Sequence, residues 1–139
     1  MTASSDDQRR SGGQGPRALL TVAVVDDDAS VRRGLERLLR SAGLSVVTFA
    51  SAEQFLALCR REVLSCLILD VHLGGMSGLE LLARLNGADS TVPVILITAH
   101  DDPQTSDAIA QSGAAGYLRK PFDDRVLIGA IMDAVAGRR

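Results

Sequence analysis

Short apolar runs alternate with amphipathic stretches along most of this chain. The runs are rich in Val, Ile and Leu and lack the strict polar alternation of a half-exposed sheet. Runs of this kind form strands that are buried on both faces, which is typical of a parallel sheet covered by helices. We predict strands at five places: 19–25, 44–49, 64–69, 92–97 and 114–118.

The stretches between the runs carry apolar residues at helical spacing. One stripe, at positions i, i+4, i+7 and i+8, consists of Val31, Leu35, Leu38 and Leu39. Asp28, Ser51 and Ser77 each stand before such a stretch and are suitable N-caps, and Pro103 suits a first helical turn. Helices are therefore predicted over about 28–42, 51–61, 103–113 and 124–136, and from Ser77 onward.

Five strands that alternate with five helices predict an α/β fold of the (βα)5 type. Because crossovers between parallel strands are right-handed, few topologies remain. The strand order 2-1-3-4-5 fits best, which is the doubly wound, flavodoxin-like arrangement with helices on both faces of a five-stranded parallel sheet. In such sheets, binding sites form outside the carboxyl ends of the strands.

Composition narrows the class of protein further. With 139 residues and 46% apolar residues, the chain fits one globular domain. Residues 1–17 are polar and lack the apolar core of a signal peptide, so we expect a disordered tail at 1–17 and a folded domain at 18–137. A net charge of −2 and 3% aromatic residues argue against nucleic-acid binding. No apolar run approaches the roughly 18 residues of a membrane span, and we expect a cytoplasmic protein.

Chemically active residues stand where the predicted strands end. Each has an ordinary structural role open to it, because aspartates cap helices, threonines bond nearby backbone and lysines are often solvated. The carboxyl ends of parallel strands meet at one edge of a sheet, however, so we expect these residues to converge. They are Asp26, Asp27 and Asp28 after the first run, Asp70 after the third, Thr98 after the fourth, and Lys120 with Pro121 after the fifth.

Such a cluster suits phosphoryl chemistry. Crowded carboxylates repel one another and favour a bound proton or cation, and oxygen ligands suit Mg²⁺, or Mn²⁺ in its place. Three carboxylates, a divalent cation and Lys120 formally cancel in charge, so an arriving phosphoryl group meets a neutralised site. The cation, Lys120 and the Thr98 hydroxyl can then hold its oxygens. One carboxylate is able to act as the nucleophile and form an acyl phosphate.

Four segments, in order and in register, resemble the receiver domain of two-component response regulators, most closely those of the nitrogen-fixation regulator type. The resemblance covers about 18–136. The segments are Val-Val-Asp-Asp-Asp at 24–28, Leu-Ile-Leu-Asp-Val-His-Leu-Gly-Gly-Met-Ser-Gly-Leu-Glu-Leu at 67–81, Ile-Thr-Ala-His at 97–100, and Tyr-Leu-Arg-Lys-Pro-Phe at 117–122.

The resemblance implies a role for each matching position in the acceptor site. Asp70 matches the residue that accepts the phosphoryl group from a sensor histidine kinase or a phosphotransfer protein. Asp26 and Asp27 match the acidic pair that holds Mg²⁺ together with Asp70 and the main-chain carbonyl of His72. Lys120 matches the lysine that contacts the phosphoryl group.

The resemblance also implies how the signal leaves the domain. Thr98 matches the switch hydroxyl, Tyr117 the aromatic residue that moves with it, and the Lys120–Pro121 bond is expected to be cis. The output surface is helix 4, strand 5 and helix 5, about 102–136, where the family also forms homodimers. It acts on a downstream protein or on an output domain outside this chain. A phosphoacceptor switch of this kind is not a turnover enzyme, and this domain is expected to contact neither nucleic acid nor membrane.

Two features depart from the family pattern or extend it. The family commonly has Pro four residues after the acceptor, where this chain has Gly74, followed by Gly75. We therefore predict a more mobile segment at 72–76. His72 and His100 flank the approach of the phosphoryl group and are candidates for tuning the lifetime of the acyl phosphate by controlling water access, if they are not simply exposed polar side chains.

Three alternatives to a phosphorylated receiver remain at this point. Asp26 and Asp28 form the D-x-D pair of a small aspartate-nucleophile phosphohydrolase, although that class needs a cap and leaves Asp70 idle. A flavin-binding module on the same fold is disfavoured because the first loop holds three aspartates, which repel phosphate. A receiver-like interaction domain that is never phosphorylated would not need all of these positions to be filled.

Overall fold

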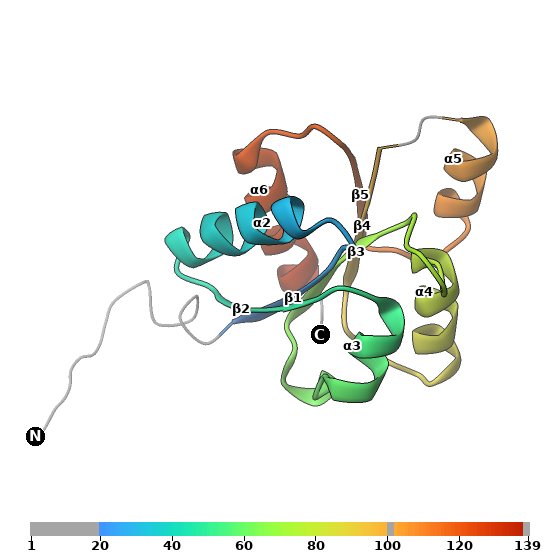
Figure 1. The fold of residues 1–139 in the computed structure, drawn as a ribbon, viewed down its shortest axis with the longest axis horizontal. Helices are drawn as coiled ribbons and strands as arrows, with labels where there is room; N and C mark the ends of the chain where they lie inside the picture. Colours follow the sequence, from blue (N-terminus) through green and yellow to red (C-terminus); the bar gives the residue numbers. More distant parts are fainter. Residues whose placement is uncertain (1–19, 100–101, 138–139) are drawn as a thin grey trace, which may run out of the picture.

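The computed structural model describes residues 20–99 and 102–137, and it shows the predicted alternation of strands and helices (Figure 1). The predicted tail at 1–17 lies outside these residues. The elements are β1 (Thr21–Val25), α2 (Ala29–Ser41), β2 (Ser45–Phe49), α3 (Ala52–Leu58), the 3₁₀ turn η2 (Arg61–Val63), β3 (Cys66–Asp70), α4 (Gly78–Gly87), β4 (Val94–Thr98), α5 (Pro103–Ala110), β5 (Gly116–Arg119) and α6 (Asp124–Gly137).

All neighbouring strands are parallel, in the order β2-β1-β3-β4-β5, which confirms the predicted topology. The register aligns Val25 with Leu69 and Asp70 with Ile97. Thr98 is aligned with Arg119, next to Lys120. The residues that follow β1, β3, β4 and β5 are therefore carried to one edge of the sheet.

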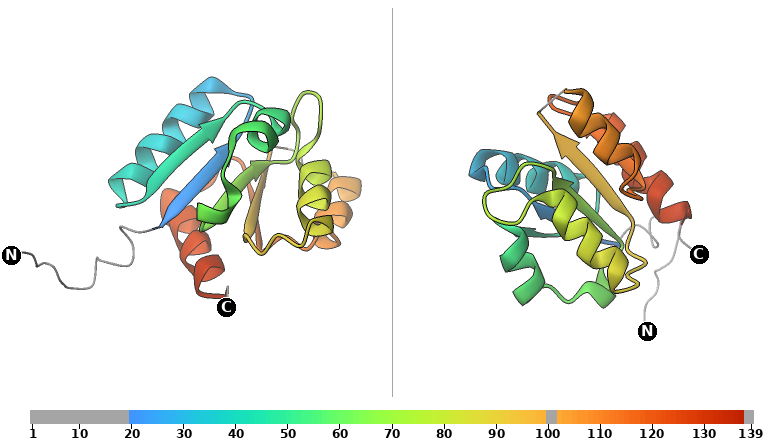
Figure 2. Two further views of the ribbon diagram at one scale, coloured as in Figure 1. Left: turned by 90° about the horizontal axis from the view of Figure 1, so that it is seen from below. Right: turned by 90° about the vertical axis from the view of Figure 1, so that its right-hand side faces the viewer.

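Helices cover both faces of the sheet (Figures 1 and 2). Successive strand residues enter different cores, because side chains alternate across a strand. Leu67 and Leu69 of β3 pack with α3, α4 and α5, whereas Ile68 packs with α2 and α6. All three are fully buried, so the middle of the sheet is closed to solvent and supports the residues at its carboxyl edge.

The edge strands correct one expectation. β2 and β5 are not buried on both faces, since their burial alternates along the strand. β2 and β5 are the edge strands, each with a neighbouring strand on one side only. The less buried residues of each strand lie on its solvent face. β5 also begins at Gly116 rather than at 114, because its pairing with β4 starts where Gly116 meets Ile95.

Local caps account for where the helices begin. Asp28 caps α2 by accepting the N–H groups of Ser30 and Val31, and Ser77 caps α4 in a reciprocal pair with Glu80. Helix α3 ends at Leu58 rather than at 61. The backbone turns extended at the C-cap Cys59, with φ −85° and ψ 132°, although Cys59 itself still packs against the core. No helix in the described part of the chain is long and apolar enough to cross a membrane.

Candidate functional site

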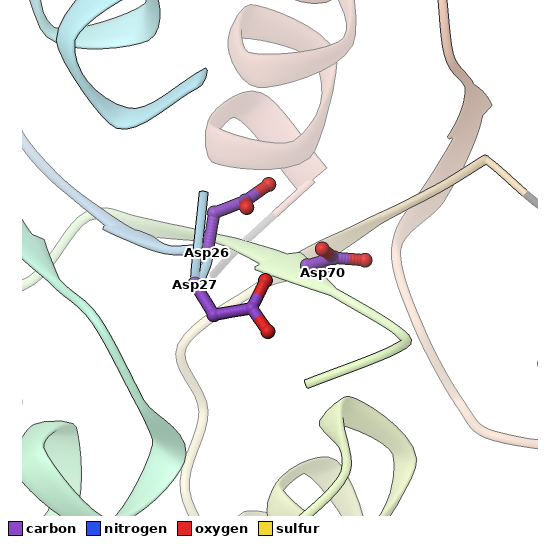
Figure 3. A group of neighbouring side chains, drawn as sticks. All are labelled: Asp26, Asp27 and Asp70. Atoms are coloured by element: carbon purple, nitrogen blue, oxygen red, sulfur yellow. The ribbon is translucent and has the colours of Figure 1, made fainter. Parts of the chain in front are cut away.

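Three carboxylates meet at the carboxyl edge of the sheet (Figure 3). Asp26 and Asp27 directly follow β1, and Asp70 is the last residue of β3. One carboxylate oxygen from each lies within 4.8 Å of the others. Asp26 and Asp70 are buried and Asp27 is exposed, so the group opens to solvent on the Asp27 side. A small oxygen-seeking cation fits this donor set.

Asp26 is held through both of its carboxylate oxygens. Its Oδ2 lies 2.9 Å from Lys120 Nζ, and its Oδ1 accepts the backbone N–H of Asp28 at 2.9 Å. Its main-chain carbonyl accepts a guanidinium N–H of Arg32 at 2.7 Å. Asp26 is therefore a fixed, paired charge.

Asp28 is also engaged, because its side chain caps α2. The D-x-D pair required by the phosphohydrolase alternative is thus divided between an ion pair and a helix cap. Asp70 is less tightly held than Asp26, since its distance to Lys120 Nζ is 3.3 Å rather than 2.9 Å and its side chain is 7% exposed rather than fully buried.

Asp70 lies between one cation and one backbone donor. Its Oδ2 is 3.3 Å from Lys120 Nζ, and its Oδ1 accepts the N–H of His72 at 3.1 Å. Burial raises the pKa of Asp70, and the His72 N–H opposes this. The charge of Asp26 raises the pKa further and Lys120 lowers it, but burial prevails. The ionised form of Asp70 is therefore destabilised by burial, and any further positive charge nearby stabilises it.

Lys120 bridges the two buried carboxylates from the end of β5. Burial by itself lowers the pKa of Lys120, but the hydrogen bond that Lys120 donates to Asp26 and the charges of Asp70 and Asp26 outweigh burial and raise it. Lys120 is therefore fully protonated at neutral pH. It supplies the positive charge that we expected from the sequence.

The other predicted site residues are placed as follows. Thr98 is fully buried at the end of β4, and Tyr117 on β5 is 39% exposed. The Lys120–Pro121 peptide bond is cis. His72 is exposed, and His100 lies outside the described residues. The roles assigned to these residues, and the mobility expected of 72–76, stay predictions.

Two residues that hold the backbone around the acidic group were not predicted from the sequence. Arg32, in the first turns of α2, holds the carbonyl of Asp26; its spacing of one helical turn beyond the cap was a usable local signal. Glu53, at the start of α3, accepts the N–H of Met76 at 2.9 Å. No local pattern links Glu53 to Met76, because they are 23 positions apart.

The raised pKa of Asp70 predicts a pH dependence of stability. An acid whose pKa is raised by folding stabilises the fold while protonated, and that contribution is lost as pH rises through the folded pKa. Asp70→Asn should therefore raise the unfolding free energy of the metal-free protein at pH 7 by about 1 kcal/mol, the scale of one partly compensated buried charge. The gain should shrink as the pH approaches about 4. Urea unfolding in EDTA measures this, and a less stable variant at pH 7 contradicts it.

Residues 22–132 match the family model described as the response regulator receiver domain. Nodulation protein W of Bradyrhizobium diazoefficiens is 40% identical over 96% of this chain and 59% of its own length. The transcriptional regulatory protein FixJ of Azorhizobium caulinodans is 42% identical over 81% of this chain and 53% of its own.

Solved structures agree. The structure titled FixJ-N has a TM-score of 0.76 at 36% identity, covering 85% of this chain and 94% of its own. The chemotaxis protein CheY4 of Vibrio cholerae has a TM-score of 0.74 at 27% identity, covering 84% and 98%.

The fold and the acidic pocket together define a flavodoxin-like α/β signalling domain. The chain belongs to the response regulator receiver family and is a receiver domain of two-component signalling. Receivers of this family generally bind Mg²⁺ at an acidic pocket and interact with histidine kinases and output domains. The chain spans between half and three-fifths of the length of the first curated relatives that it matches.

Proposed function

We propose that this chain accepts a phosphoryl group on Asp70 from the phosphohistidine of a sensor kinase or phosphotransfer protein. The observation that carries the proposal is the placement of Asp70. Its carboxylate is buried at the carboxyl edge of the sheet, bound to Lys120 and to the His72 N–H, with Asp26 and Asp27 beside it. Positive charges at this site would stabilise both the ionised carboxylate of Asp70 and the oxygens of an incoming phosphoryl group.

In the proposed step, an Asp70 oxygen forms a bond to phosphorus while the bond between phosphorus and the donor imidazole nitrogen breaks. The imidazole keeps the electron pair and takes up a proton. Lys120 stabilises the negative charge of the transferred group, and the Thr98 hydroxyl donates to one of its oxygens. The product is an acyl phosphate, which water later hydrolyses.

Asp26, Asp27, Asp70 and the main-chain carbonyl of His72 would hold Mg²⁺, or Mn²⁺, at this site. The cation would supply the positive charge that neutralises the carboxylates and the incoming phosphoryl oxygens. The oxygen-only donors and the solvent opening at Asp27 fit an ion that retains several waters.

Magnesium binding should stabilise the fold by mass action. At a free Mg²⁺ concentration ten times the Kd, the unfolding free energy should rise by about 1.4 kcal/mol. Asp27→Asn should remove most of this gain, because it deletes an exposed ligand without leaving a buried charge unpaired. Thermal unfolding with increasing MgCl₂, and with KCl at matched ionic strength, measures the effect. An equal response of Asp27→Asn and wild type argues against Asp27 as a ligand.

Phosphorylation would shift the domain between two states rather than create a new one. The acyl phosphate must bind one conformation of Thr98 and Tyr117 better than the other to bias the α5–β5–α6 surface. We propose that this surface contacts a downstream protein, an output domain or a second copy of the chain. On this proposal the domain works in the cytoplasm and is a switch rather than a turnover enzyme.

Incubation with acetyl phosphate and Mg²⁺ tests the proposal. Intact mass spectrometry should show one added phosphoryl group on the wild-type protein and none on Asp70→Asn. Circular dichroism of both proteins controls for folding. Equal phosphorylation of the Asp70→Asn variant overturns the assignment of Asp70.

A further inference from the structure

The loop between β3 and α4, residues 71–77, directly follows Asp70 and leads from the sheet to α4 (Figure 2). It carries the main-chain carbonyl of His72, which the proposed function assigns to the cation. The loop contains Gly74 and Gly75, and Gly75 has a φ of 76°. Two consecutive glycines have unusual backbone freedom. The loop therefore needs contacts from outside itself to hold one conformation.

Two of these contacts come from carboxylates of the acidic group. Asp70 accepts the N–H of His72 at 3.1 Å, and Asp27 accepts the N–H of Gly74 at 3.4 Å. These carboxylates are also the proposed ligands of the cation. The oxygens of Asp27 and Asp70 can therefore either accept the loop N–H groups or bind a cation. Their contacts with the loop depend on whether a cation is bound.

Glu53 supplies a third contact that has no such second use. Its Oε2 accepts the N–H of Met76 at 2.9 Å, and Glu53 is not a member of the acidic group. The Met76 N–H and then the Glu53 N–H lower the pKa of this carboxyl, desolvation opposes them, and the charge of Arg84 adds a weaker lowering effect. The carboxylate thus stays ionised and bonded to the loop at neutral pH.

The backbone at Gly75 is shaped around the same carboxylate. A Cβ built on Gly75 would lie 2.8 Å from Glu53 Oε2. The glycine therefore provides both the positive φ and the close approach that the contact needs. On the other side of the loop, the side chains of Leu73 and Met76 pack against the core that α3 and α4 share. The loop is therefore held on one side by the hydrogen bond to Glu53 and on the other by the packing of Leu73 and Met76.

We propose that Glu53 is a positioning residue of the acceptor site, which holds the 72–76 loop, and with it the His72 carbonyl, against α3. This proposal rests on the proposed function for the use of that carbonyl. It assigns to a side chain of α3 a restraint that the backbone of Gly74 and Gly75 does not provide by itself. Glu53 does not touch the phosphoryl group.

The test compares Glu53→Ala and Glu53→Gln with Glu62→Ala. Glu62 is an exposed acid on η2, so its removal matches the change in charge without touching the loop. The first measurement is amide hydrogen exchange in EDTA. In Glu53→Ala, exchange at residues 72–76 should accelerate about tenfold, equivalent to ~1.4 kcal/mol for one hydrogen bond to a charged group. Exchange of the Ile68 and Leu96 amides in the sheet should be unchanged.

The second measurement is Mg²⁺ affinity by calorimetry. It should fall several-fold in Glu53→Ala, fall less in Glu53→Gln, which keeps a neutral acceptor oxygen, and stay at the wild-type value in Glu62→Ala. Unchanged exchange at 72–76 in Glu53→Ala overturns the proposal. So does equal acceleration throughout the sheet, which would make Glu53 a general structural residue. Neither measurement requires phosphoryl transfer, so a failure of Asp70 to accept phosphate is seen separately.

Discussion

Replacing Lys120 by methionine is expected to slow phosphorylation by acetyl phosphate about 100-fold, the scale of removing one preorganised donor from a charged transition state. The same change should lower the unfolding free energy by about 2 kcal/mol. Breaking a buried ion pair costs about 3–5 kcal/mol, and Lys120 retains 21% side-chain exposure, which moderates the loss. Both effects have one cause, because Nζ neutralises Asp26 and Asp70 at once.

Lys120→Arg separates charge from position. Arginine keeps the positive charge but replaces a compact ammonium group with a planar fork, so it should recover much of the stability and little of the rate. The stability loss in Lys120→Met should be constant near neutral pH. It should fade in strong alkali, where the wild-type lysine, whose pKa is raised, loses its proton. Stopped-flow labelling and urea unfolding measure the two quantities. A variant as stable and as fast as wild type contradicts the account.

Replacing Gly78 by alanine should disrupt the acceptor site from behind. A Cβ on Gly78 would lie 2.1 Å from the main-chain oxygen of Asp70 and 2.9 Å from its carbonyl carbon. Backbone atoms at the end of a buried strand cannot yield as a flexible side chain would. We expect a loss of about 3 kcal/mol in unfolding free energy, together with reduced phosphorylation because Asp70 itself must move.

Gly34→Ala is the matched control for this experiment. Gly34 lies in α2, and its added Cβ meets nothing within 4 Å. Alanine at an exposed helical position should therefore raise stability by about 0.5–1 kcal/mol. Chemical denaturation of both variants, with phosphorylation measured below the transition, gives the comparison. Equal stability of Gly78→Ala and wild type would show that Asp70 is not tightly backed by α4.

The parts of the fold that the sequence predicted well are those with local or periodic causes. The three central strands are continuous apolar runs, and all of their residues except Thr21 are buried. The caps at Asp28 and Ser77 use side chains two or three residues from their partners. The boundaries were less accurate. Helix α3 ends where the backbone becomes extended at Cys59, and β5 begins where its pairing with β4 starts at Gly116. Neither point is set by the periodic pattern of apolar residues.

The candidate site follows the same division. Asp26, Asp27 and Asp70 could be placed together because parallel strands deliver their carboxyl ends to one edge. How closely each carboxylate is paired could not be predicted. Lys120 pairs with both Asp26 and Asp70, from 94 and 50 residues away, and lies nearer to Asp26. The contact between Glu53 and Met76 is non-local in the same way, and Glu53 lies outside all four of the family-like segments.

The position of the phosphoryl group on the chain decides whether Asp70 is the acceptor. The protein is incubated with acetyl phosphate and Mg²⁺, the acyl phosphate is trapped by reduction with borohydride, and the modified residue is located by peptide mass spectrometry. We expect reduction at Asp70, dependence on Mg²⁺ and no modification of Asp26. Modification at Asp26, or an unmodified Asp70 in a folded protein that binds Mg²⁺, would contradict this expectation.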